Sequence, residues 1–304
     1  MPKSYENQKN LIFEITYGLD DEVNEYLVGP QENPDTKIDK ITISGMRASV
    51  DIYATGIYDA SNSSSLSARI YGLSPDAMAR CSSLNNEVAM MKKNSIVIYA
   101  VDGDVKSLIF AGNIYLAWAD YSMLPQTFLR IEAQSLYFAR LAAQTPSSFK
   151  GEVNAATVIE TIAYKMGYAF ENNGVTTKLR DVAVTGSYKE QADAIAQMAG
   201  INMSAENGVV AIWPKDGSRS QYTLKIGRDT GMVGYPTFLN AGISTNIIYH
   251  PNATVGGEIE MITDVYGVYG VYYITSLRHM LDSNTPNGRW YTQINALRGN
   301  QVGK

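Results

Sequence analysis

The order of segments along the chain limits the possible folds more than any single motif does. Residues 11–17, 41–54, 64–73 and 95–100 are rich in Ile, Val, Tyr and Thr with partial apolar–polar alternation, which predicts strands. Runs such as GEIEMIT and GVYYITSLRHML predict further strands near the C-terminal end. Two helix-like segments stand between these strand-rich regions. The sequence therefore predicts a mainly β protein with an α+β module in its middle.

One helix is predicted to interrupt the first strand-rich region. Ser74 is a suitable N-cap, Pro75 fits the first helical position, and Asp76 favours the positive end of the helix dipole. The helix is expected to run to about Met91, which gives a helical insertion near 74–91.

The middle of the chain carries two amphipathic helix patterns, at 155–165 and 187–199. In the second, Ser187 precedes Glu190 by three residues, which is the spacing of a capping box. The Asn-Gly dipeptide at 207–208 lies between apolar runs and favours a tight hairpin turn. The elements of this module are expected in the order β-α-β-β-α-β-β.

These patterns divide the chain into three predicted domains. Residues 1–147 form a first β-barrel with the helical insertion, 148–217 form the α+β module, and 218–304 form a second β-barrel. The two outer regions have similar strand density, which indicates a duplicated barrel unit, although no repeat of fixed period is present.

Histidine and cysteine, the usual ligands of zinc, are few in this sequence. His250, His279 and Cys81 are the only histidines and cysteine, fewer than the four ligands usual in a structural zinc site. Both histidines lie in strand patterns and are interpreted as structural. The Asp-Gly-Asp tripeptide at 102–104 lacks the other ligands of a calcium loop and is interpreted as a hairpin turn.

The usual catalytic motifs are also missing from the sequence. It contains no G-x-S-x-G element, no Walker phosphate loop and no strand-linked G-x-G-x-x-G motif. We therefore predict no enzyme activity, no catalytic residues, and no cofactor or metal site. A Ser-His-Asp triad and a pair of catalytic carboxylates can come from distant residues, so these two alternatives stay open.

Charge and hydropathy bear on partners and compartment. The chain has 25 Lys and Arg against 30 Asp and Glu, a net charge of −5, which gives no footprint for specific nucleic-acid binding. The N-terminus lacks a signal-peptide pattern, and no apolar run reaches the ~18 residues of a membrane span. The sequence predicts a soluble protein, with no membrane partner, made in a reducing cytoplasm.

Three stretches carry motifs of a known family: residues 95–133, the middle module, and residues 231–297. The motif positions are Phe110, Gly112, Ile114, Gly231, Gly234, Pro236, Pro251, Gly256, Gly257, Tyr273, Thr275, His279, Pro286, Gly288 and Trp290. In their order along the chain, the stretches resemble the hub proteins of contractile phage tails, a family that includes the late control protein D group and the N-terminal part of type VI secretion spikes. We interpret all of these motif positions as scaffold positions in cores and turns.

The resemblance implies two tube-type β-barrels per chain and a homotrimer, hence a pseudo-sixfold ring in the virion's tail baseplate. Such a ring joins the tail tube protein to the central spike protein, and the tape measure protein is a further expected partner. It also implies passage of DNA through the lumen during genome ejection. The net charge of −5 would repel DNA phosphates there, although it could equally serve solubility. Because the chain stops at Lys304, the spike is expected to be a separate protein.

Two other functions compete with the hub. A β-rich tail-tip adhesin could bind host-surface glycans through some of the 21 tyrosines, but two capped helices between barrels are unusual for an adhesin. A peptidoglycan-cleaving enzyme is disfavoured by the missing catalytic motifs.

Overall fold

The computed structural model describes residues 9–18, 38–56, 63–82, 94–141, 143–219 and 222–298. The chain forms two compact units. The first comprises Met1–Ile52, Ser65–Phe138 and Leu281–Arg289; the second comprises Tyr53–Ser64, Ala139–Met280 and Trp290–Lys304. Strands dominate both units, so the prediction of a mainly β protein is confirmed.

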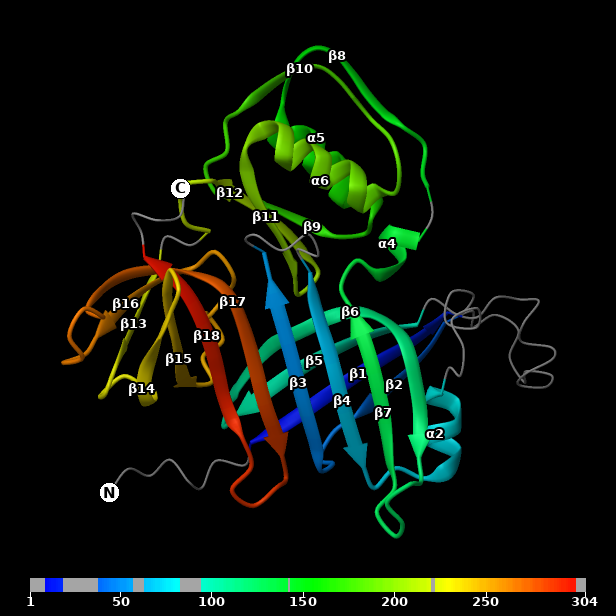
Figure 1. Cartoon of the computed structure of the whole chain (residues 1–304). Coiled ribbons are helices and arrows are strands. Elements are labelled where there is room, and N and C mark those ends of the chain that lie inside the picture. The colour runs from blue at the N-terminus through cyan, green and yellow to red at the C-terminus, as the bar shows by residue number, and fades with distance from the viewer. Residues whose placement is uncertain are drawn as a thin grey trace. The chain divides into compact units, whose positions relative to one another are not determined.

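An antiparallel sheet forms most of the first unit. Its order is β3-β4-β7-β6-β5-β1-β2, and β1 crosses behind β3 and β4 in the view of Figure 1. The strands are β1 (Asn10–Gly18), β2 (Ile38–Ile43), β3 (Ala48–Thr55), β4 (Ser64–Tyr71), β5 (Ser95–Asp102), β6 (Val105–Asp120) and β7 (Phe128–Gln134). Alternate residues of the strands face the core, as Leu11, Phe13 and Ile15 do on β1, and these side chains are fully buried.

Two turns in this unit fall where local predictions were made. Residues 41–54 were predicted as one strand, but a turn at Gly45, with φ of 70°, separates β2 from β3. The turn between β5 and β6 at 102–104 is confirmed, with Asp102 paired to Val105.

Helix α2 (Pro75–Cys81) begins as predicted. The Ser74 hydroxyl accepts a hydrogen bond from the Ala77 N–H, and Pro75 is the first helical residue. The helix ends at Cys81 because Ser82 is extended, and its hydroxyl donates to the Met78 carbonyl. The predicted continuation to about Met91 is thus interrupted at Ser82, and its residues 83–91 lie outside the described part.

The α+β module lies in the second unit, after the short helix α4 (Tyr137–Leu141). Its elements are β8 (Ser147–Asn154), α5 (Ala155–Lys165), β9 (Ala169–Asn172), β10 (Lys178–Val184), α6 (Tyr188–Ala199), β11 (Ile201–Glu206) and β12 (Val209–Pro214). The predicted order is confirmed. Figure 1 shows α5 and α6 side by side, framed by the β8–β10 ribbon and the sheet β11-β12-β9.

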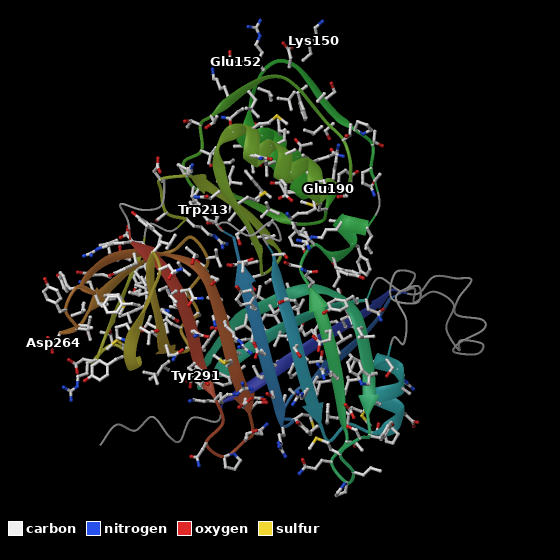
Figure 2. All side chains as sticks on the ribbon, in the orientation of Figure 1. Lys150, Glu152, Glu190, Trp213, Asp264 and Tyr291 are labelled. Atoms are coloured by element: carbon white, nitrogen blue, oxygen red, sulfur yellow. The ribbon has the colours of Figure 1, made fainter. Side chains whose placement is uncertain are left out.

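The capping and turn chemistry of the module also follows the prediction. Ser187 and Glu190 form both hydrogen bonds of a capping box, and α6 stops at the left-handed Gly200. Asn207 and Gly208 both have positive φ in the β11–β12 turn, which is the conformation of a type I′ turn. On strand β8 of the same module, the side chains of Lys150 and Glu152 project into solvent (Figure 2).

Six strands complete the second unit, and β17 carries its last residues into the first. They are β13 (Thr223–Gly227), β14 (Met232–Leu239), β15 (Gly242–Ile248), β16 (Glu258–Ile262), β17 (Gly270–Ser283) and β18 (Trp290–Arg298). Their order is β14-β15-β18-β17-β16-β13, and β13 runs parallel to β16. One hydrophobic core joins these strands to Ala211 and Trp213 of β12, so the module and the six strands fold as one body. In the described residues, no helix combines the length and apolar character needed to cross a membrane.

Candidate functional site

The first group of motif positions shapes strand β6. Phe110 and Ile114 are buried in the core of the first unit. A Cβ on Gly112 would lie 2.7 Å from Cζ of Phe110 and 2.9 Å from the carbonyl carbon of Gln134, so only glycine fits there. These positions expose no polar group that could bind a ligand.

The second group lies at the start of β14 and makes it irregular. Gly231 and Gly234 have φ of 94° and 74°, conformations that favour glycine. The register with β15 shifts between Val233 and Thr237, which is a bulge, and the Pro236 side chain within it is buried.

The third group shapes the loop from β15 to β16. Gly256 has φ of 82°, and a Cβ there would lie 2.5 Å from Cζ2 of Trp213. A Cβ on Gly257 would lie 2.9 Å from the Thr254 carbonyl oxygen. Pro251 lies at the exposed start of this loop. The two glycines therefore allow the loop to pack closely on β12.

The histidine and tryptophan of the last motif lie in the core. His279 Nδ1 lies 2.7 Å from the Thr292 hydroxyl oxygen. Burial lowers the pKa of His279 to about 4, so the ring is neutral near pH 7. The Tyr249 ring packs edge-on against the rings of His279 and Trp290, at 5.4 and 6.0 Å between centroids. This environment is that of a structural histidine with a partner.

The other positions of that motif stabilise strand pairing and the final hairpin. The Thr275 hydroxyl donates to the Asn295 carbonyl on β18. Pro286 and Gly288 lie in the β17–β18 turn, where a Cβ on Gly288 would approach the Asp282 Cβ to 2.9 Å. Tyr273 pairs with Glu258 across β17 and β16. The fifteen motif positions are thus distributed over both units and do not converge on one site.

The part of the chain that the structure describes contains no candidate metal site. No three His, Cys, Asp or Glu side chains in it come together as a possible metal site. His250 accepts a hydrogen bond from the Asn252 N–H, and burial lowers the pKa of its ring. Cys81, the one cysteine of the sequence, is buried.

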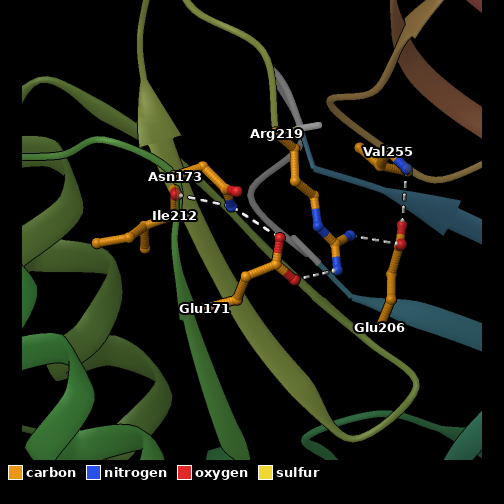
Figure 3. Close-up of polar contacts among 6 residues, drawn as sticks. All are labelled: Glu171, Asn173, Glu206, Ile212, Arg219 and Val255. Carbon is orange, nitrogen blue, oxygen red and sulfur yellow. Dashed lines mark hydrogen bonds and ion pairs between the residues drawn. The ribbon is translucent and has the colours of Figure 1, made fainter. Parts of the chain in front are cut away.

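The structure reveals a buried charged junction that the sequence did not indicate (Figure 3). Arg219, in the loop after β12, donates from Nη1 to Oε2 of Glu206 at 2.8 Å and from Nη2 to Oε2 of Glu171 at 3.4 Å. The other oxygen of Glu206 accepts from the Val255 N–H at 3.3 Å. Glu171 is held in turn by the Asn173 side-chain amide, at 2.8 Å. The junction therefore ties β9 and β11 of the module to the β15–β16 loop.

The electrostatics of this junction are those of a desolvated ion pair. Arg219 is only 8% exposed, and Glu206 is buried as well. Burial raises the pKa of Glu206, while the positive charge of Arg219 and the two hydrogen bonds oppose that rise. Removing one partner would leave the other charge buried and unpaired. This lowers the free energy of unfolding far more than removing both charges does.

A second feature missed in the sequence is the exposed apolar edge formed by β14. Val233, Tyr235, Phe238 and Leu239 are all exposed, Tyr235 by 79% and Phe238 by 65%. The strand pairs with β15 on one side and has no strand on its other side among the described residues. Contiguous exposed apolar residues on an edge strand are typical of an interaction surface.

The loop between β16 and β17 presents further aromatic side chains. Val268 is buried in the core and Val265 packs against it, which fixes the loop near Asp264 (Figure 2). In consequence Tyr266 is 97% exposed and Tyr269 is 60% exposed. Exposed tyrosines of this kind are common at contact surfaces.

Comparison with solved structures defines the class of fold. The tail protein from Neisseria meningitidis MC58 is similar with a TM-score of 0.58 and 10% identity, covering 94% of this chain and 96% of that one. The 43 kDa tail protein of prophage MuSo2 from Shewanella oneidensis has a TM-score of 0.59 and 9% identity, covering 97% and 98%. The E. coli c3393 protein, a type VI secretion component described as similar to T4 tail proteins gp27 and gp5, has a TM-score of 0.54 and 9% identity, covering 83% and 73%. The fold is therefore the one found in these tail and secretion proteins.

A match between the sequence and a family model shows the family. The model of the family described as baseplate hub gp41 matches residues 76–294, which is more than half of the chain. The protein belongs to this baseplate hub family and is a structural component of a phage tail. No curated protein matches the sequence at a significant level.

Proposed function

We propose that the protein forms a homotrimeric, pseudo-sixfold ring that joins the tail tube to the central spike of the baseplate. The observation that carries the proposal is the family match over 76–294, because that span includes strand-rich segments on both sides of the α+β module. Three chains with two such segments each provide six around a ring. Within this proposal, residues 1–147 and 218–304 act as tube-type β-barrels, and 148–217 act as the module between them.

The role proposed for the protein is mechanical, without catalysis. Its partners are two further copies, the tail tube protein, the spike protein and the tape measure protein. The fifteen motif positions serve as scaffold. This agrees with the burial of Phe110, Ile114, His279 and Trp290, and with the tight contacts that a Cβ would make at Gly112, Gly256, Gly257 and Gly288. The chain is made in the host cytoplasm and acts in the virion during genome ejection.

Mass in solution tests the proposal directly. Three chains of 33.4 kDa give a species of about 100 kDa by light scattering, and negative-stain images should show a ring. The measurement is made on the full chain alone and again after co-expression with candidate tube and spike proteins. A monomer that persists with both partners present would refute the ring.

Binding of host glycans is the second candidate, favoured by the exposure of Tyr235, Tyr266 and Tyr269. Tyrosine rings can stack on sugars, although they serve equally well in protein interfaces. A glycan array separates the two functions. Specific binding that Tyr266→Ala abolishes would support the adhesin, whereas a blank array with an intact ring would support the hub.

A further inference from the structure

On the core side of the sheet, the edge strand β14 is not covered by other described residues. Phe238 lies opposite Ile243 of β15, so both residues belong to the same face of the sheet. Ile243 is 1% exposed and lies in the core, whereas Phe238 is 65% exposed. The core face of the sheet therefore continues onto β14 without a cover in the described part of the chain.

The edge lacks charge, one of the usual protections against pairing with another strand, and its bulge and Pro236 interrupt only the part before residues 237–239. Natural edge strands are commonly blocked by charged residues, especially lysine. Strand β2, which ends the sheet of the first unit, follows this rule, since its Lys40 is exposed and pairs with Glu14 at 2.8 Å. Strand β14 reads MVGYPTFL and carries no charge.

A strand fits as the cover of this edge. It can pair with the free backbone groups of residues 237–239 and place apolar side chains beside Phe238. A neutral, apolar seam is typical of permanent contacts between identical chains, because transient partners rely more on polar and charged groups.

We infer that β14 pairs with a strand from a second copy of this chain, and that this pairing covers Phe238. The inference rests on the proposed ring and names the surface that closes it. The contact is head-to-tail, since a three-membered ring needs two different surfaces on each copy.

Site-specific photo-crosslinking tests the contact in the full chain, alone and co-expressed with candidate tube and spike proteins. Benzoylphenylalanine replaces Phe238, and in the control it replaces Tyr164, which is 62% exposed on α5. We expect covalent dimers and trimers from position 238 only, with the adduct in a peptide of this chain. An adduct to tube or spike peptides, or one confined within a single chain, would overturn the inference.

A charge substitution supplies the independent measurement. Because Phe238 is exposed, Phe238→Lys should leave far-UV circular dichroism and the melting temperature of the monomer unchanged. We expect it to weaken self-association at least about tenfold, while Tyr164→Lys does not. An unchanged trimer would refute the role of β14 and leave the ring itself standing, whereas a wild-type monomer under all conditions would refute the ring.

Discussion

Replacing Arg219 with methionine should destabilise the second unit strongly, because it strands a buried carboxylate. Methionine has a similar length but cannot donate the 2.8 Å hydrogen bond to Glu206 or balance its charge. Breaking a buried ion pair from one side costs about 3–5 kcal/mol of the free energy of unfolding. Glu206→Gln leaves the carboxylate of Glu171 beside Arg219 and keeps an acceptor for the Val255 N–H, so its cost should be about 1–2 kcal/mol.

The double variant and the pH dependence separate this explanation from a simple loss of packing. If the cost of Arg219→Met comes from the unpaired carboxylate, then adding Glu206→Gln should restore part of the lost stability. Since burial raises the pKa of Glu206, the folded state holds its proton more tightly than the unfolded state, and stability falls as pH rises through the folded pKa. Losing Arg219 raises that pKa further, so the deficit should shrink as the pH is lowered from neutral.

Urea denaturation followed by tryptophan fluorescence measures all four proteins of the cycle. The chain has three tryptophans, and the buried Trp213 reports on the region of the junction. A deficit for Arg219→Met below about 1 kcal/mol, or a double variant less stable than that single variant, would contradict the reasoning.

Three further substitutions test local features of the fold. Gly256→Ala should cost at least about 2 kcal/mol more than Gly267→Ala by urea denaturation, because both glycines have positive φ but only the first meets Trp213. His279→Asn should make the protein less sensitive to acid. The pKa of His279 in the folded state, about 4, lies below the ordinary 6.5, so the neutral ring stabilises the fold fully above pH 6.5 and loses this effect as the pH falls towards 4. Melting temperatures of both proteins across that pH range measure the difference. Ser187→Ala should lower the free energy of unfolding by about 1 kcal/mol through loss of the N-cap, again measured in urea.

The features that the sequence predicted correctly are those specified by neighbouring residues. The capping box of Ser187 and Glu190 places the start of α6 because its hydrogen bonds join residues three apart. The Asn207–Gly208 turn is equally local, since both residues accept a positive φ. The order of elements in the module follows from these signals.

The features that the sequence missed depend on distant residues. Arg219 meets Glu206 and Glu171, which lie 13 and 48 positions away, and nothing in their surroundings signals burial. Strand β14 was missed because its glycines and Pro236 break the alternation on which strand prediction relies. A bulged edge strand is thus recognised only once its neighbour is known.

The buried junction also explains how a small module can be held in one register on a strand-rich body. Apolar contact is non-directional, so the shared core around Trp213 would tolerate small sliding movements. An ion pair removed from water tolerates much less, because a shift of a few ångströms would leave both charges unpaired. Close packing acts in the same direction, since a Cβ on Gly56 would lie 2.7 Å from Val255 and 2.8 Å from Ser204. The charged pair therefore selects one arrangement of the module, and the apolar core supplies most of the stability of that arrangement.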